Sequence, residues 1–167
     1  MESASVLESI AEVAIALAGF GGIAAGLGYR SRGTWPSDDQ LRLMLLAAVS
    51  LVVVFACFLP YLTHNLGFPA PWRTASAVFL LAPASTLLYQ IWFSRRGLPA
   101  SYSRVAACLV AIADILALAL LFRAVLGYAG VRESGFYVSA VLLMLFKASL
   151  FFIRLLATSF RSNEPAA

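Results

Sequence analysis

The sequence predicts an all-α membrane protein, a single bundle of five transmembrane helices that takes up the whole chain, 1–167. The chain is 62% hydrophobic and only 12% charged, whereas about half of the residues in a soluble domain are apolar and about a quarter are charged. Uncharged runs at 43–63 and 74–94 have the length of the roughly 20 apolar residues that cross a bilayer core. This composition excludes a water-soluble fold.

Five apolar segments qualify as spans, and each is expected to be a helix. In hydrocarbon, every backbone N–H and C=O needs a partner within the protein. Barrel strands would be shorter, at about 10 residues, and would alternate in polarity, unlike these long segments rich in Leu and Ala. The predicted spans are 6–28, 41–63, 74–93, 105–126 and 136–158.

The first span is the least certain crossing because it is the most polar. It contains Glu8, Glu12 and several glycines between Gly19 and Gly28. Since charged residues are rare within transmembrane segments, a re-entrant or interfacial placement is the alternative to a full crossing.

Basic residues orient the chain, because cytoplasmic loops near transmembrane ends carry an excess of Lys and Arg. With five spans, the first and third loops lie on the same side as the C-terminus. This side carries Arg30, Arg32, Arg42, Arg95, Arg96, Arg104, Arg154 and Arg161. The opposite side carries only Arg73, Arg123 and Arg132. The N-terminus is therefore expected outside and the C-terminus inside, and the net charge of +4 reflects topology and contact with anionic lipids rather than nucleic-acid binding.

Asp114 and Lys147 are predicted to form an ion pair inside the bilayer. They lie on consecutive antiparallel spans, at depths of about 14 and 16 Å from the inner face at 1.5 Å per residue. A charge near mid-membrane costs roughly 2.5–3.5 kcal/mol on insertion scales, so an opposite charge at the same depth is the simplest arrangement. Glu12 and Arg123 both fall in the outer leaflet and are expected to form a second pair. In the alternative, Glu8, Glu12, Asp114 and Lys147 line a polar route for ions or protons.

One face of the first span gathers acids and glycines. At about 100° per residue, Glu8, Glu12, Gly19 and Gly26 share a stripe. Residues Gly22 to Gly26 match the GxxxG pattern, which lets two helices approach closely. The stripe either packs against the fourth span of the same chain or joins copies of the chain. In a symmetric oligomer, Glu8 and Glu12 would form an acidic ring that selects cations at an outer pore mouth.

Pro83 is expected to kink the third span. It lies in the middle of that span and removes the hydrogen bond that a backbone N–H would donate to the carbonyl of Phe79. A kink of this kind exposes backbone carbonyls, or nearby hydroxyl groups compensate for the lost bond.

The sequence contains no enzymatic or metal-binding signature. It has one histidine, too few for a multi-histidine metal site, and no GxSxG nucleophile elbow. Cys57 and Cys108 fall at different depths of their spans, too far apart for a disulfide. Neither catalytic residues nor a cofactor are therefore expected.

The functional expectation is an oligomeric ion-conducting or transport-related protein, in what is taken to be a bacterial plasma membrane. Its expected partners are the lipid bilayer and either further copies of the chain or partner helices. The alternative is a non-catalytic membrane subunit or scaffold that binds partner helices through its Gly- and Ala-rich first helix.

Overall fold

A computed structural model describes residues 2–32, 37–95, 104–127 and 133–161, and within these ranges the protein is helical with no strands. The six helices are α1 (Glu2–Arg32), α2 (Ser37–Asn65), α3 (Pro71–Phe79), α4 (Leu81–Arg95), α5 (Arg104–Leu126) and α6 (Glu133–Arg161). Helices α3 and α4 together make one span, so five segments are long and apolar enough to cross a membrane. The prediction of an all-α, five-span membrane protein is confirmed.

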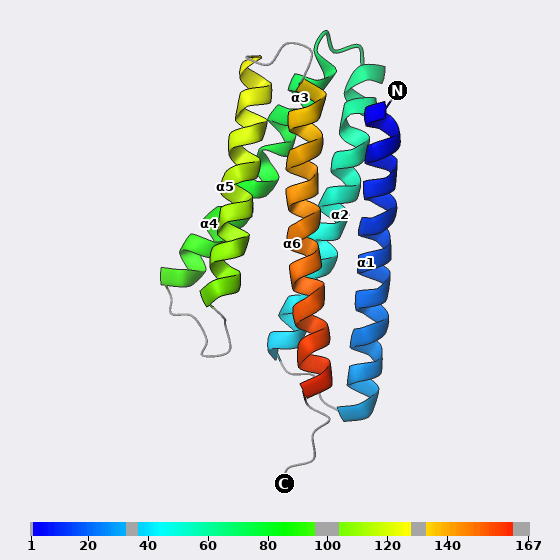
Figure 1. Ribbon diagram of the computed structural model, residues 1–167, viewed down its shortest axis with the longest axis vertical. Coiled ribbons are helices and arrows are strands. Elements are labelled where there is room, and N and C mark those ends of the chain that lie inside the picture. Colours follow the sequence, from blue (N-terminus) through cyan, green and yellow to red (C-terminus); the bar gives the residue numbers. More distant parts are fainter. Residues whose placement is uncertain (1, 33–36, 96–103, 128–132, 162–167) are drawn as a thin grey trace.

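The helices run up and down along one long axis (Figure 1). We call the end that holds the start of α1 the upper end and the end that holds the last turn of α6 the lower end. Helix α6 is central and packs against α1, α2 and α5, while α1 also packs along α2. Helix α1 is continuous from Glu2 to Arg32, which excludes a re-entrant loop for the first span.

The interior of the bundle combines large side chains, such as Leu46, Tyr137 and Met144, with many small ones, while other large apolar side chains face outward. Phe55 and Leu81 are 70% and 73% exposed, as expected for residues in contact with lipid. Buried alanines occur on every long helix, namely Ala11, Ala14, Ala25, Ala56, Ala113, Ala117, Ala124, Ala140 and Ala148. Lipid tails are as apolar as these side chains, so helices associate in a membrane through close packing rather than through the hydrophobic effect.

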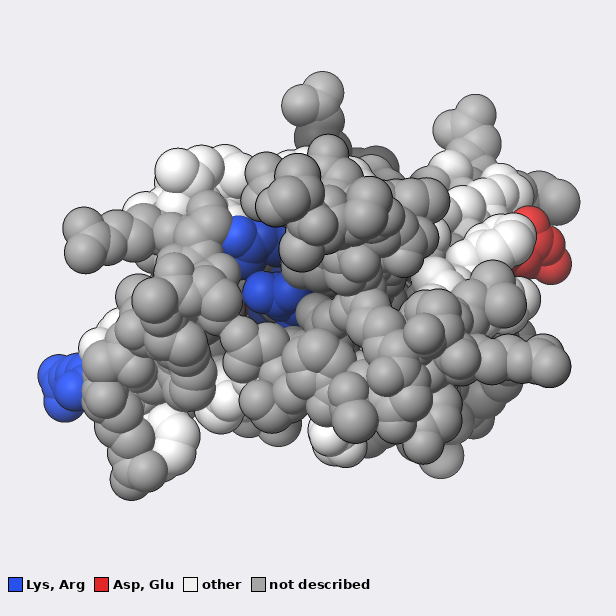
Figure 2. Space-filling model, turned by 90° about the horizontal axis from the view of Figure 1, so that it is seen from below, with Lys and Arg blue, Asp and Glu red and all other residues white. Residues whose placement is uncertain are grey.

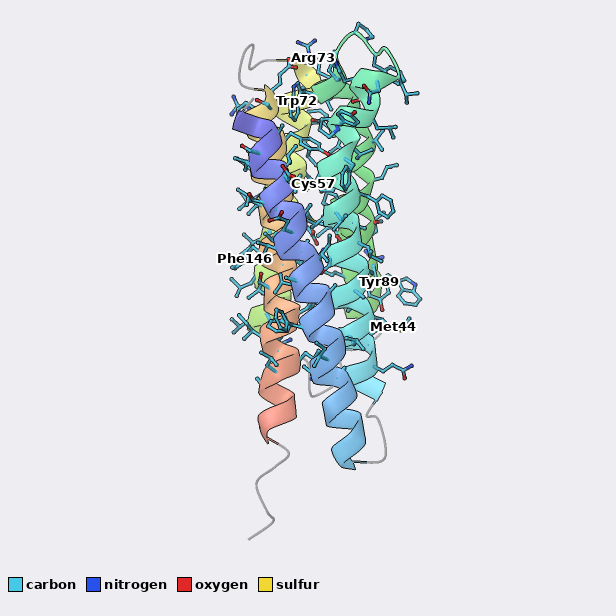
Figure 3. The ribbon with its side chains drawn as sticks, turned by 90° about the vertical axis from the view of Figure 1, so that its right-hand side faces the viewer. Met44, Cys57, Trp72, Arg73, Tyr89 and Phe146 are labelled. Carbon is cyan, nitrogen blue, oxygen red and sulfur yellow. The ribbon has the colours of Figure 1, made fainter. Side chains whose placement is uncertain are left out.

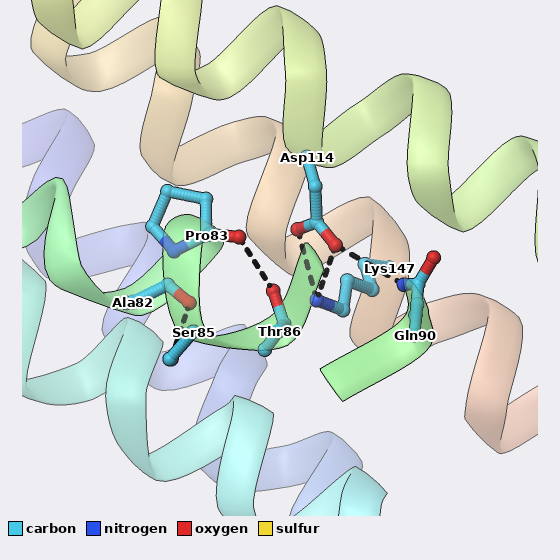
Figure 4. Close-up of polar contacts among 7 residues, drawn as sticks. All are labelled: Ala82, Pro83, Ser85, Thr86, Gln90, Asp114 and Lys147. Atoms are coloured by element: carbon cyan, nitrogen blue, oxygen red, sulfur yellow. Dashed lines mark hydrogen bonds and ion pairs between the residues drawn. The ribbon is translucent and has the colours of Figure 1, made fainter. Parts of the chain in front are cut away.

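The third span is broken where Pro83 was expected to kink it. Helix α3 ends at Phe79, Leu80 forms the junction, and α4 begins at Leu81. Pro83 has no N–H to donate to the carbonyl of Phe79. Just beyond Pro83, the hydroxyl groups of Ser85 and Thr86 donate to the carbonyls of Ala82 and Pro83, at 2.9 and 3.0 Å (Figure 4).

The break changes what the two halves of the span contact. Helix α3 packs against α2, α5 and α6, whereas α4 packs against α5 and touches the end of α3. At the upper end, the Tyr137 hydroxyl of α6 donates a 2.6 Å hydrogen bond to the Ala56 carbonyl of α2, and the Tyr137 ring contacts Trp72 and Phe79 of α3. Helix α3 is therefore fixed within the bundle, while α4 diverges from α2 and α6 toward the lower end.

Candidate intramembrane site

The predicted ion pair between Asp114 and Lys147 is present and buried. The Lys147 ammonium donates to both carboxylate oxygens of Asp114, at 2.9 Å to Oδ1 and 3.1 Å to Oδ2. Their side chains are 2% and 0% exposed. Helices α5 and α6 pack closely, which holds the two charges at one level. Removing either partner would leave an uncompensated charge inside the bundle.

Gln90 of α4 completes this cluster. Its side-chain amide Nε2 donates to Asp114 Oδ2 at 3.2 Å, so the carboxylate accepts hydrogen bonds from two neighbouring helices (Figure 4). Because α4 contacts neither α2 nor α6 extensively, this bond ties α4 to the bundle through α5. We refer to Gln90, Asp114 and Lys147 as the polar cluster.

A cavity of about 480 Å³ lies against the polar cluster, between α2, α4, α5 and α6. Apolar side chains make up most of its wall, and the polar groups among them belong chiefly to α4. Its lining residues are Leu45 and Val49 of α2; Ser85, Thr86, Leu87, Tyr89, Gln90, Ile91 and Ser94 of α4; Ala107, Cys108 and Ala111 of α5; and Lys147 and Phe151 of α6. Figure 3 shows Tyr89 and Met44 on the side where α4 and α2 meet the surroundings.

The cavity is walled on three sides and open on the fourth. The pairs α4 with α5, α5 with α6, and α6 with α2 are packed, whereas α2 and α4 are not a packed pair. A second, wholly uncharged groove follows the same line between α2 and the α3–α4 span, and Ser85 lines both. The gap between α2 and α4 therefore leads sideways from the cavity to the outside of the bundle.

The two cysteines occupy different environments. Cys57 is buried within the bundle, whereas Cys108 is exposed and lines the cavity. The described helices hold no group of three or more His, Cys, Asp or Glu residues that would bind a metal ion.

The stripe on α1 does not pack within the chain. Glu8, Glu12, Gly19, Gly22 and Gly26 are all exposed, and a Cβ atom added to any of the three glycines would meet nothing within 4 Å. The predicted contact with the fourth span is therefore wrong, because α1 packs against α2 and α6 instead of α5.

The glycine that brings α1 close to another helix is Gly21. It is buried, and a Cβ atom there would collide with the side chain of Leu46 on α2. The GxxxG pattern pointed to the wrong face of the helix, because spacing alone does not say which side of α1 meets its neighbours.

The predicted pair of Glu12 and Arg123 is also wrong. The Arg123 guanidinium lies 5.8 Å from the centre of the Phe136 ring, and the described residues show no ion pair between Arg123 and Glu12. Helix α6 separates α1 from α5 (Figure 1), so a similar depth in the membrane does not bring these side chains together.

Sequence reasoning missed Gln90 and the cavity. Gln90 is an amide within an apolar span, one turn beyond Thr86 and two turns beyond Pro83. Polar residues at such spacing share a helix face, and this was the available signal. The cavity depends on the direction of α4 after the break, which residue type alone does not encode.

Comparison with protein-family models, with curated protein sequences and with solved structures finds no match to this chain. We therefore infer the function from the polar cluster and the cavity beside it.

Proposed function

We propose that this protein is a transport-related membrane protein whose working site is the cavity between α2, α4, α5 and α6, where an apolar or amphipathic solute binds. The observation that carries this proposal is a cavity of about 480 Å³ with the buried, ion-paired Lys147 in its wall. Ligand sites typically have volumes of about 300–1,000 Å³ and combine mostly apolar walls with a few placed polar groups.

A largely apolar solute suits this cavity better than a bare ion. Asp114 already neutralises Lys147, and the remaining wall is mostly apolar. An ion that enters such a space loses its hydration shell without gaining enough ligands to replace it. The polar cluster instead offers hydrogen bonds to a polar group of a solute whose apolar part fills the cavity.

Cys108 provides a direct test, because it is a thiol in the cavity wall. In detergent-solubilised full-length Cys57→Ala protein, the rate of maleimide labelling at Cys108 is measured with increasing 1-dodecanol, a neutral amphiphile. We expect saturable protection of Cys108. A cysteine placed at Ile15, which is 60% exposed on α1, serves as the control in a chain without Cys57 and Cys108 and should not be protected.

A cavity-filling variant tests whether the protection comes from dodecanol that occupies the cavity. Ala111 lines the cavity, while its neighbour Ile112 is 53% exposed on the outside of α5. Ala111→Trp should abolish protection by dodecanol, and Ile112→Trp should leave it unchanged. The proposal is wrong if dodecanol never protects Cys108, or if Ala111→Trp leaves the protection intact.

A second candidate function is assembly with partner helices through α1, where a stripe of exposed glycines and two acids faces away from the bundle. Oxidative crosslinking tests the version in which the partner is a second copy. In a chain that lacks its native cysteines, Ile23→Cys on the stripe should form dimers, whereas Val13→Cys on another exposed face of α1 should not. Equal crosslinking at both positions would indicate random collision and count against an α1 interface.

A further inference from the structure

Two arginines, Arg42 on α2 and Arg154 on α6, follow the lining residues of the cavity toward its lower end, and we call them the cationic rim. On α2, Arg42 precedes the lining residues Leu45 and Val49 by three and seven positions. On α6, Arg154 follows Phe151 and Lys147 by three and seven positions. Residues at these spacings lie on one helix face. Both arginines are therefore placed on the faces that line the cavity, within one turn of the lower ends of their spans.

Basic side chains are visible at the lower end of the bundle. Figure 2 looks at the bundle from below and shows Lys and Arg side chains near the middle of this face and at one edge of it. Arg42 and Arg154 are both partly exposed. Each guanidinium has five N–H donors in a planar fork, so it can bind a phosphate oxygen pair beside other contacts.

The route into the cavity favours an occupant from the bilayer. The cavity is open between α2 and α4, and the apolar groove that continues above it is lined by the same two segments. The same two segments carry large apolar side chains that face lipid. Phe55, Leu81 and Leu88 are each at least 67% exposed. An acyl chain can pass sideways through this gap without leaving an apolar environment.

We infer that the cavity binds an anionic membrane lipid, with an acyl chain against the apolar wall and the phosphate headgroup at Arg42 and Arg154. This inference rests on the proposed function, because it names the ligand class of the same cavity. Arg154 lies about 10 Å below Lys147 along α6 at 1.5 Å per residue. The headgroup then stays at the membrane interface, below the polar cluster, while the acyl chain lies against the apolar wall of the cavity.

The test compares two lipids that differ only in headgroup charge. In detergent-solubilised Cys57→Ala protein, protection of Cys108 from maleimide is titrated with phosphatidylglycerol and with phosphatidylcholine carrying identical acyl chains. We expect half-protection at an about tenfold lower concentration of phosphatidylglycerol, since each basic residue near an anionic headgroup contributes favourably. The preference should shrink in high salt, which screens exposed charges.

Variants assign the preference to the rim. The double replacement Arg42→Gln with Arg154→Gln should remove the difference between the two lipids. Arg123→Gln, which removes one cation from the upper end of the bundle, should retain it. The comparison of lipids in the protein with intact arginines needs no rim variant, so the inference stays testable even if the double variant does not fold.

The possible results distinguish a failure of the anionic-lipid inference from a failure of the proposed solute-binding cavity. Equal protection by both lipids, with dodecanol still protective, overturns the anionic-lipid assignment and leaves the solute-binding cavity standing. Protection by neither lipid nor dodecanol overturns both. A preference for phosphatidylglycerol that persists in the double variant overturns the role of Arg42 and Arg154.

Discussion

The side-chain amide of Gln90 donates a 3.2 Å hydrogen bond to the carboxylate of Asp114. This bond joins α4, the half-helix that diverges after the break at Leu80, to the one buried carboxylate of the described part of the bundle. The same carboxylate is the counter-ion of Lys147. The position of α4, and with it the open side of the cavity, is therefore coupled to the buried ion pair.

Gln90→Leu should weaken the attachment of α4 while leaving the ion pair in place. Hydrogen bonds between helices in membranes contribute about 0.6 kcal/mol on average, so we expect a loss of stability of about that size, measured by unfolding in detergent. Labelling of Cys108 should become faster, because α4 covers it less tightly. Leu88→Ala, at a 67% exposed position on the same helix, should change neither quantity. Unchanged Cys108 labelling in Gln90→Leu would show that packing against α5 alone positions α4.

Because Lys147 and Asp114 form an ion pair, we expect the effects of replacing them on the free energy of unfolding to be strongly non-additive. Lys147→Met leaves the Asp114 carboxylate buried without its cation and should cost about 3–5 kcal/mol. In a chain that already carries Asp114→Asn, the same replacement should cost much less, because no charge is then stranded. The measurement is a double-mutant cycle of unfolding free energies in detergent or lipid. Equal costs in the two backgrounds would mean that the two charges do not depend on each other.

Gly21 predicts a sharp contrast between adjacent positions of α1. Gly21→Ala places a methyl group against Leu46, which is 0% exposed and has little freedom to move, so overpacking should cost about 1–3 kcal/mol. Gly22→Ala meets no neighbouring atom. Both replacements gain the same helix propensity, up to about 1 kcal/mol, so the difference between the two unfolding free energies isolates the collision. Similar values would show that Leu46 rearranges without cost.

The five spans, the break in the third span and the buried ion pair could be predicted from the sequence, because each follows from the chemistry of residues at known positions along the chain. Five apolar segments give five spans, because a bilayer leaves the backbone no other partners. Pro83 marks the break in the third span, because it lacks the N–H group that a continuous helix needs. Asp114 and Lys147 meet because opposite charges at equal depth on consecutive helices have few other partners.

Features set by the arrangement of helices around one another were not predictable. Depth along a span is readable from residue number, but the order of helices around the bundle is not, and the expected pair of Glu12 and Arg123 failed for this reason. The same ambiguity assigned close packing to Gly22 when Gly21 makes the contact with Leu46. The cavity likewise depends on the direction that α4 takes after Leu80, which follows from packing that no local pattern records.

Orientation in the membrane is the last prediction, and it decides which compartment the cationic rim faces. The excess of arginines in the first and third loops and the C-terminal tail predicts that the lower end lies in the cytoplasm. A C-terminal fusion to green fluorescent protein should therefore fluoresce in bacterial cells, and a C-terminal fusion to alkaline phosphatase should be inactive. Replacing Arg95 and Arg96 by Gln should weaken this bias without touching the polar cluster, because charge near span ends sets topology. An active phosphatase fusion would place Arg42 and Arg154 at the outer leaflet and reverse the side from which a lipid headgroup reaches the cavity.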